Sequence, residues 1–219
     1  MKKILLTIGV LCASVLSCPA QSLAGMFRLA DDHETVFDVS GGTNVSILTY
    51  IPAGGPQTIM DGRVMGFNLG AGVSFHLLEG FWIESGLGLS SRGGRDVSLF
   101  DNMFSSCYLE LPLALSLRIP VAPDVDAYVD LGGYGAYGLF GRTVNEVTSF
   151  PFFGKDPVNV ARPLDYGLLA GFGGILADRI KLGFRYEYGL GNISNATTLQ
   201  TSYGSIFNSA MAFSVGYIF

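Results

Sequence analysis

Two glutamates, Glu84 and Glu110, come closest in type and placement to an acid/base pair. Each lies at a polar position of a segment in which apolar and polar residues alternate. Paired carboxylates support general acid and base catalysis when their environments separate their pKa values. Arg185 lies at the same kind of position and is available as their counter-ion, so the sequence favours a structural ion pair. We therefore predict no catalytic residues and no enzymatic activity.

The charged residues at such polar positions form a larger set with one shared expected orientation. Its members are Glu84, Glu110, Arg118, Asp126, Asp130, Asp165, Lys181, Arg185 and Glu187. If the segments close into a narrow barrel, this set faces the lumen as either an ion pathway or a side-chain plug. We favour the plug, because the interior of an eight-stranded barrel is just wide enough to be filled by side chains. Within it we expect Arg185 to lie among Glu84, Glu110 and Glu187.

The first 20 residues have the pattern of a secretory signal peptide. Lys2 and Lys3 precede an apolar run over 4–16, and a small-residue site predicts cleavage after Ala20. A loose lipobox ending at Cys18 is the alternative, and it would leave that cysteine lipidated. We expect residues 21–35 to form a periplasmic lead-in segment and residues 36–219 to form one barrel domain.

Composition excludes several kinds of site in the mature chain. Of 13 Lys and Arg residues two leave with the signal peptide, so 11 face 18 acids and the net charge is −7, which argues against nucleic acid as a partner. Cys107 is the one cysteine left, so neither an intramolecular disulfide nor a cysteine-based zinc site can form. His33 and His76 are the two histidines, and both are expected on the periplasmic side. The sequence thus indicates no metal, no cofactor and no Ser/His catalytic site.

Alternation with period two, the period of a β-strand, organises the rest of the chain. In the segment 164–176, Leu164, Tyr166 and Leu168 share one face, while Asp165 and Gly167 share the other. Eight segments follow this rule, namely 36–45, 62–77, 81–91, 107–119, 125–141, 164–176, 180–190 and 205–219. Most have the length of membrane-crossing strands, which need roughly 9–11 residues. Pro112 interrupts one of them and predicts a β-bulge.

The connections between these segments alternate in length. Long connections are expected at 46–61, 92–106, 142–161 and 192–204, and short turns separate the other segments. Outer-membrane barrels have short periplasmic turns and long extracellular loops. Loop length and hydrophobic alternation are independent signals, and together they predict an all-β, eight-stranded antiparallel up-and-down transmembrane β-barrel. We expect it in the outer membrane of a Gram-negative bacterium, surrounded by lipid and monomeric.

Several motifs resemble a known family. The segment 165–174 (DYGLLAGFGG), the segment 182–194 and the ending 214–219 (SVGYIF) are similar to the outer-membrane β-barrel domain family of Bacteroidota, often labelled PorT-like. The resemblance covers essentially the whole mature chain and implies an eight-stranded barrel. The aromatics Phe213, Tyr217 and Phe219 also resemble the signal read by the barrel-assembly machinery, which is the partner expected during biogenesis. Most family members have no assigned activity.

The expected loops are where a specific activity would lie. The longest, 142–161, carries Phe150, Phe152 and Phe153, and exposed apolar clusters of this kind usually mark contacts with a partner. The alternative is that these rings fold over the barrel mouth as a lid or dip into the outer leaflet. The sequence thus predicts a plugged barrel that presents loops for adhesion, envelope organisation or binding of an extracellular or envelope protein. A lipid-modifying enzyme and a narrow channel are the alternative functions.

Overall fold

The computed structural model shows an antiparallel β-structure. It describes residues 34–51, 58–59, 62–96, 102–144, 149–154, 161–195 and 204–219, so the expected signal peptide and most of the lead-in segment lie outside the described residues. Eight long strands are present: β1 (Thr35–Ile51), β3 (Val64–Leu78), β4 (Phe81–Asp96), β5 (Asn102–Ala122), β6 (Val125–Val144), β8 (Leu164–Leu176), β9 (Ile180–Gly189) and β10 (Ser205–Ile218). Two short strands, β2 (Thr58–Ile59) and β7 (Ser149–Pro151), add to the ends of β1 and β6.

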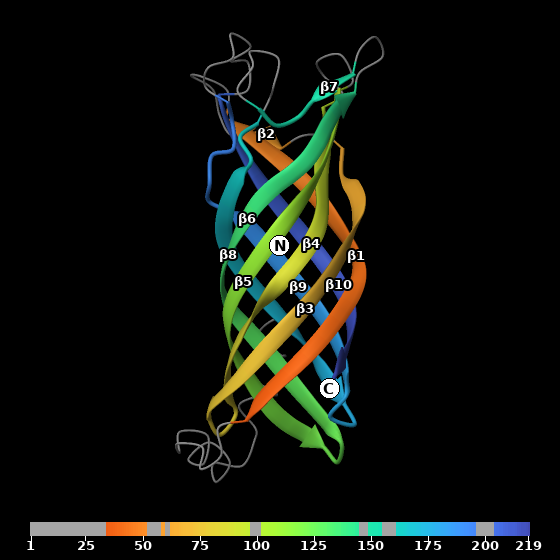
Figure 1. The fold of residues 1–219 in the computed structure, drawn as a ribbon, viewed down its shortest axis with the longest axis vertical. Helices are drawn as coiled ribbons and strands as arrows, with labels where there is room; N and C mark the ends of the chain where they lie inside the picture. The colour runs from red at the N-terminus through yellow and green to blue at the C-terminus, as the bar shows by residue number, and fades with distance from the viewer. Residues whose placement is uncertain are drawn as a thin grey trace, which may run out of the picture.

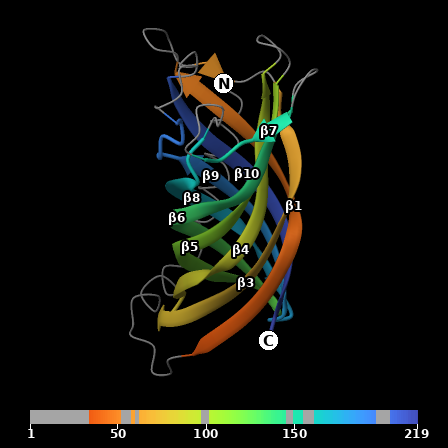
Figure 2. The ribbon, with the colours of Figure 1, turned by 45° about the horizontal axis from the view of Figure 1, so that its top comes forward.

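The eight long strands form a closed ring. Each pairs antiparallel with the next in chain order, and β10 pairs back onto β1 over fourteen residue pairs, from Asp38 opposite Ile218 to Ile51 opposite Ser205. Figure 1 shows the tall, strongly tilted strands, and in Figure 2 the strands β8, β9 and β10 pass behind β4, β5 and β6. The predicted eight-stranded up-and-down barrel is confirmed.

In this ring the apolar side chains face outward and many polar side chains face inward, the reverse of a water-soluble protein. Large apolar side chains cover the outside, among them Leu113 (60% exposed), Leu131 (63%) and Leu168 (56%). The alternate positions point inward and are buried although many are polar. They include Asn44, Ser74, Glu84, Ser90, Arg92, Glu110, Asp130, Asp165, Glu187 and Asn208. An apolar outer band with a polar interior fits a barrel that lipid surrounds.

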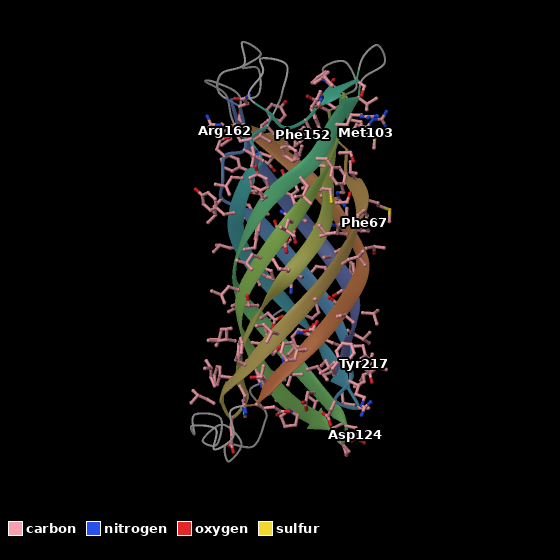
Figure 3. All side chains as sticks on the ribbon, viewed as in Figure 1. Phe67, Met103, Asp124, Phe152, Arg162 and Tyr217 are labelled. Atoms are coloured by element: carbon pink, nitrogen blue, oxygen red, sulfur yellow. The ribbon has the colours of Figure 1, made fainter. Side chains whose placement is uncertain are left out.

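The two ends of the barrel differ. At one end, the turn end, two or three residues join β3 to β4, β5 to β6 and β8 to β9. These turns use left-handed backbone, with φ of 82° at Gly80 and 60° at Asp124. The longer connections lie at the opposite end, the loop end. Figure 3 shows Asp124 and Tyr217 near the turn end, and Met103, Phe152 and Arg162 near the loop end.

The strands reach farther at the loop end than the sequence suggests. The loop predicted over 92–106 is wrong over most of its length, because β4 continues to Asp96 and β5 begins at Asn102. The ladder between them runs on through Arg92 opposite Ser106 to Asp96 opposite Asn102. In the same way β1 runs six residues beyond its predicted end at Val45. Polar residues at these strand ends hid the β-structure, since no lipid enforces apolar alternation there.

The bulge predicted at Pro112 is also wrong. The β4–β5 register is the same on both sides of it, with Ser85 opposite Leu113 and Gly88 opposite Glu110, and only the ladder bonds beside the proline are missing. The Ser85 hydroxyl donates to the Pro112 carbonyl at 2.9 Å.

A bulge does occur higher in β6. Cys107 opposes Phe140 while Tyr108 opposes Gly138, so Leu139 is the extra residue. Leu139 (48% exposed) and Phe140 (67%) therefore both face outward, and the inward positions of β6 move to Thr143 beyond the bulge.

The outward register of β5 gives the first test. Leu115 lies midway along the outward apolar run from Leu109 to Val121 and is 47% exposed. Leu115→Arg is expected to cost roughly 2–4 kcal/mol because the charge would lie near the bilayer midplane, whereas Val121→Arg at the strand end should cost about 0–1 kcal/mol. Urea unfolding in lipid vesicles measures both free energies. Equal costs at the two positions would contradict the placement of β5 in the bilayer.

Candidate functional site: the barrel interior

The guanidinium group of Arg92 lies inside the barrel, in the half of the lumen nearer the loop end. Its side chain, which starts from β4, is completely buried. Nη2 donates to Glu110 Oε1 on β5 and to Glu187 Oε2 on β9, and Nη1 donates to Asp165 Oδ2 on β8 at 3.4 Å. Since β4 and β9 lie on different sides of the ring, this one side chain connects strands across the lumen.

Polar and aromatic groups complete this arginine cluster. The Tyr134 hydroxyl accepts from Arg92 Nη1 and also lies 3.3 Å from Asp165 Oδ2, to which it can donate. Asn208 Nδ2 donates to the same carboxylate oxygen and to the Tyr108 hydroxyl, at 3.2 Å in each case. The rings of Tyr134 and Tyr108 lie 4.8 and 5.5 Å from the guanidinium carbon, which is within the range of cation–π attraction. Six strands of the ring therefore contribute to one buried network.

A second network, the glutamate cluster, lies nearer the turn end. Glu84 accepts from Arg118 Nη2 at 2.8 Å and from Lys181 Nζ at 2.6 Å. Lys181 comes from β9 and Glu84 from β4, so this cluster also crosses the lumen. The Trp82 ring lies 4.1 Å from the guanidinium carbon of Arg118, and the Tyr128 ring lies 4.9 Å from Lys181 Nζ. Charged and aromatic side chains thus fill the barrel at two levels.

The prediction that Arg185 pairs with Glu84, Glu110 and Glu187 is wrong. In the described part of the chain, no ion pair joins it to Glu84, Glu110 or Glu187, and these acids pair with Arg92, Arg118 and Lys181 instead. Arg185 lies opposite Gly171 of β8 and Ala212 of β10 in the sheet. Its side chain lines a cavity between the two clusters. Arg92 was missed because it falls in a segment that the sequence indicated to be a loop.

The other proposed lumen residues lie at three levels. Asp165 belongs to the arginine cluster, Asp130 is buried beside the cavity between the clusters, and Asp126 is half-buried near the turn end. The nine residues thus share an interior orientation without forming one network.

An apolar cluster, the mouth cluster, lies in the barrel at the loop end. It consists of Leu48, Phe104, Phe152, Ala161, Ile193 and Ile206, with Tyr50 and Phe153 packed against it. Phe152 is 1% exposed, and its ring lies 5.7 Å from that of Phe104. Phe153 meets the Tyr108 ring edge-on at 5.3 Å, directly above the arginine cluster. The prediction that Phe152 and Phe153 form an exposed contact is therefore wrong, and the lid alternative describes them, while Phe150 is half-buried on β7.

The described residues give little support for a histidine-based catalytic site or a metal site. His76 stacks on Trp82 at 4.5 Å near the turn end, far from the loop end. Among the described residues, no three His, Cys, Asp or Glu side chains lie close enough together to hold a metal ion. In the same part of the chain no helix is long and apolar enough to cross a membrane.

Comparison with known families decides the identity. The model of the family described as "Outer membrane protein beta-barrel domain" matches residues 20–195. The chain belongs to this family. It is therefore an outer-membrane protein of a Gram-negative bacterium, and its barrel lies in lipid. In such barrels the short turns are periplasmic, so the turn end faces the periplasm and the mouth cluster faces the cell exterior.

Several solved outer-membrane proteins are similar to this barrel. Ail, the attachment invasion locus protein of Yersinia pestis solved with the heparin analogue sucrose octasulfate, is 15% identical, with coverage of 85% of this chain and 99% of that chain and a TM-score of 0.45. OprG from Pseudomonas aeruginosa is 11% identical over 89% and 98%, with a TM-score of 0.46. The outer membrane enzyme PagL is 12% identical over 84% and 98%, with a TM-score of 0.34. No curated protein matches closely enough to count as a relative.

Removal of Arg92 tests the arginine cluster. Arg92→Ala leaves the carboxylates of Glu110, Asp165 and Glu187 without their shared cation, and we expect it to lower the free energy of unfolding by about 3–5 kcal/mol. Arg162→Ala, at an exposed position near the extracellular end, is the control and should change stability by less than about 0.5 kcal/mol. Urea unfolding in lipid vesicles gives both values. Similar stability of the two variants would contradict the central role of Arg92.

Truncation of Phe152 tests the mouth cluster. Phe152→Ala removes a fully buried ring, so a loss of about 3–5 kcal/mol is expected, as for other core phenylalanines. Phe150→Ala, on the same segment but at a half-buried position, should cost clearly less. The measurement is again unfolding by urea. If Phe150→Ala costs as much as Phe152→Ala, the ring of Phe152 does not close the mouth.

Proposed function

We propose that this protein is a closed, monomeric surface barrel that presents its extracellular end to a partner, in adhesion or in organisation of the envelope. The observation that supports this most directly is the crossing of the lumen by Arg92. With the mouth cluster on one side of it and the glutamate cluster on the other, side chains of the described residues fill the lumen at three levels, which supports a closed interior. The extracellular end is then the part of the barrel that is free to act.

The extracellular end carries a small sheet that continues above the lipid-facing part of the strands. This sheet extension consists of residues 92–96 of β4, 102–106 of β5, 141–144 of β6 and the short strand β7. Its outward face exposes Met103 (45%) and Val144 (43%), which are directly opposite each other. Arg95 opposes Met103 on the other side, and Arg142 is exposed nearby. A sheet face of mixed apolar and arginine residues suits a protein partner, since methionine and arginine are enriched in interfaces.

The two alternative functions have weaker support. A channel would need the two clusters to open together, which would break several buried ion pairs. A lipid-modifying enzyme acting on the outer leaflet would need catalytic groups near the extracellular end, whereas His76 lies at the periplasmic end. We therefore propose that the chain is not an enzyme.

Three finer points belong to the same proposal. The motifs at 165–174 and 214–219 support membership of the PorT-like barrels of Bacteroidota. Phe213 (57% exposed), Tyr217 (40%) and Phe219 (75%) face outward along β10, which fits a signal for the barrel-assembly machinery. The expected division into signal peptide, lead-in and barrel, with no cofactor, completes the proposal.

Three measurements on the native protein test this function. In planar bilayers it should carry no steady current, and in mixed vesicles it should remove no acyl chain from lipid A. A photo-crosslinking residue in place of Val144 on intact cells should form an adduct with a discrete protein, while the same residue in place of the lipid-facing Leu115 should not. Current, loss of acyl chains, or equal adducts at the two positions would contradict the proposal.

A further inference from the structure

A cavity of about 110 Å³, lined by both polar and apolar groups, lies in the lumen between the arginine cluster and the glutamate cluster. One ladder row runs along it: Asp130, Gly171, Arg185, Ala212 and Asn44 are successive backbone partners on β6, β8, β9, β10 and β1, and all of them except Gly171 line the cavity. The small residues between the polar ones leave the space open. A single water needs about 10–15 Å³ on this measure, so the cavity has room for several.

Two buried oxygen atoms of residues at this cavity lack a hydrogen bond in the described part of the chain, and so does the Ser116 hydroxyl, which lies opposite Asp130 in the β5–β6 ladder. Asp130 is 4% exposed and Asn44 is 1% exposed, and both line the cavity. Asn44 Nδ2 donates to Ser90 Oγ at 2.9 Å, which fixes the amide. In the described part of the chain, neither Oδ1 of Asp130 nor Oδ1 of Asn44 accepts a hydrogen bond. Both atoms are acceptors, and a buried acceptor without a partner is costly.

The lumen around the cavity also carries excess negative charge. The carboxylates of the two clusters and of the cavity wall are Asp38, Glu84, Glu110, Asp130, Asp165 and Glu187, and the cations there are Arg92, Arg118, Lys181 and Arg185. Six acids therefore face four cations, which leaves an excess of two negative charges when all are ionised. Burial of uncompensated charge is unfavourable, so the interior favours a further positive charge, either a proton on a carboxylate or a bound cation.

We propose that this cavity binds a hydrated monovalent cation, of the sodium or potassium class. The oxygens of Asp130 and Asn44 accept from its water shell or contact it directly, and the charge excess favours its entry. The hydrated form follows from the geometry, since no three acidic side chains of the described residues converge as direct metal ligands. A calcium ion would need about 6–8 oxygen ligands at short distance.

Thermal unfolding of the whole folded protein in a neutral detergent tests the site. The midpoint is compared in sodium chloride and in N-methyl-D-glucamine chloride of equal ionic strength, since the second cation is too large for the cavity. At a tenfold excess of sodium over its dissociation constant, the midpoint should be higher by roughly 3–6 °C. Asp130→Asn should abolish the difference, and Asp124→Asn in the exposed periplasmic turn should retain it.

A direct measurement keeps the test decisive if Asp130→Asn does not fold. Sodium-23 line broadening by the native protein should saturate at one ion per chain and reverse on addition of potassium. Equal midpoints in the two salts, a sodium effect that persists in Asp130→Asn, or broadening that does not saturate would each overturn the proposal. Equal midpoints would mean that protons on the carboxylates balance the buried charge and that water fills the cavity.

Discussion

The ion pairs of Arg92 are the interaction on which the rest of this barrel depends. One guanidinium group on β4 serves carboxylates on β5, β8 and β9, and each of these acids is buried. The arrangement is sensitive to loss of its cation, because a buried carboxylate without a partner costs far more than the intact pair contributes. The cluster therefore fixes which strands face one another across the lumen. It also separates the mouth cluster, on its extracellular side, from the cavity on its periplasmic side.

Two different surroundings explain the remainder of the structure. Lipid on the outside requires apolar side chains at every second position, and a lumen only a few side chains wide requires that the inward residues fill it. Aromatic rings take part on both faces. Phe172, Phe184 and Phe213 pack in a row on the lipid side, while Tyr108, Tyr128 and Tyr134 lie beside the buried cations. This leaves the extracellular end as the part of the barrel that we propose to carry the function.

The sequence predicts the ring well, because lipid enforces the alternation from which each strand was inferred. Above the lipid this constraint ends, so the polar ends of β4 and β5 have a sequence pattern that predicts a loop. The missed signal was the parity of β4, in which Glu84, Ser90, Arg92 and Asp96 all lie at even positions and are all buried. Whether a residue number is odd or even along a strand tells which face of the sheet its side chain lies on. It does not tell the level of that side chain along the axis of a tilted barrel. For this reason Arg185 was placed with the wrong acids, and the inward packing of Phe152 could not be inferred.

The coupling between Arg92 and Glu187 is the most direct measure of the proposed closure. A double-mutant cycle with Arg92→Gln and Glu187→Gln, followed by urea unfolding in lipid vesicles, isolates their interaction from the separate effects of each change. Because the two residues start from β4 and β9, on different sides of the ring, coupling between them requires contact across the lumen. We expect a coupling free energy of about 1–3 kcal/mol. Additive effects, with a coupling near zero, would contradict a lumen closed by Arg92.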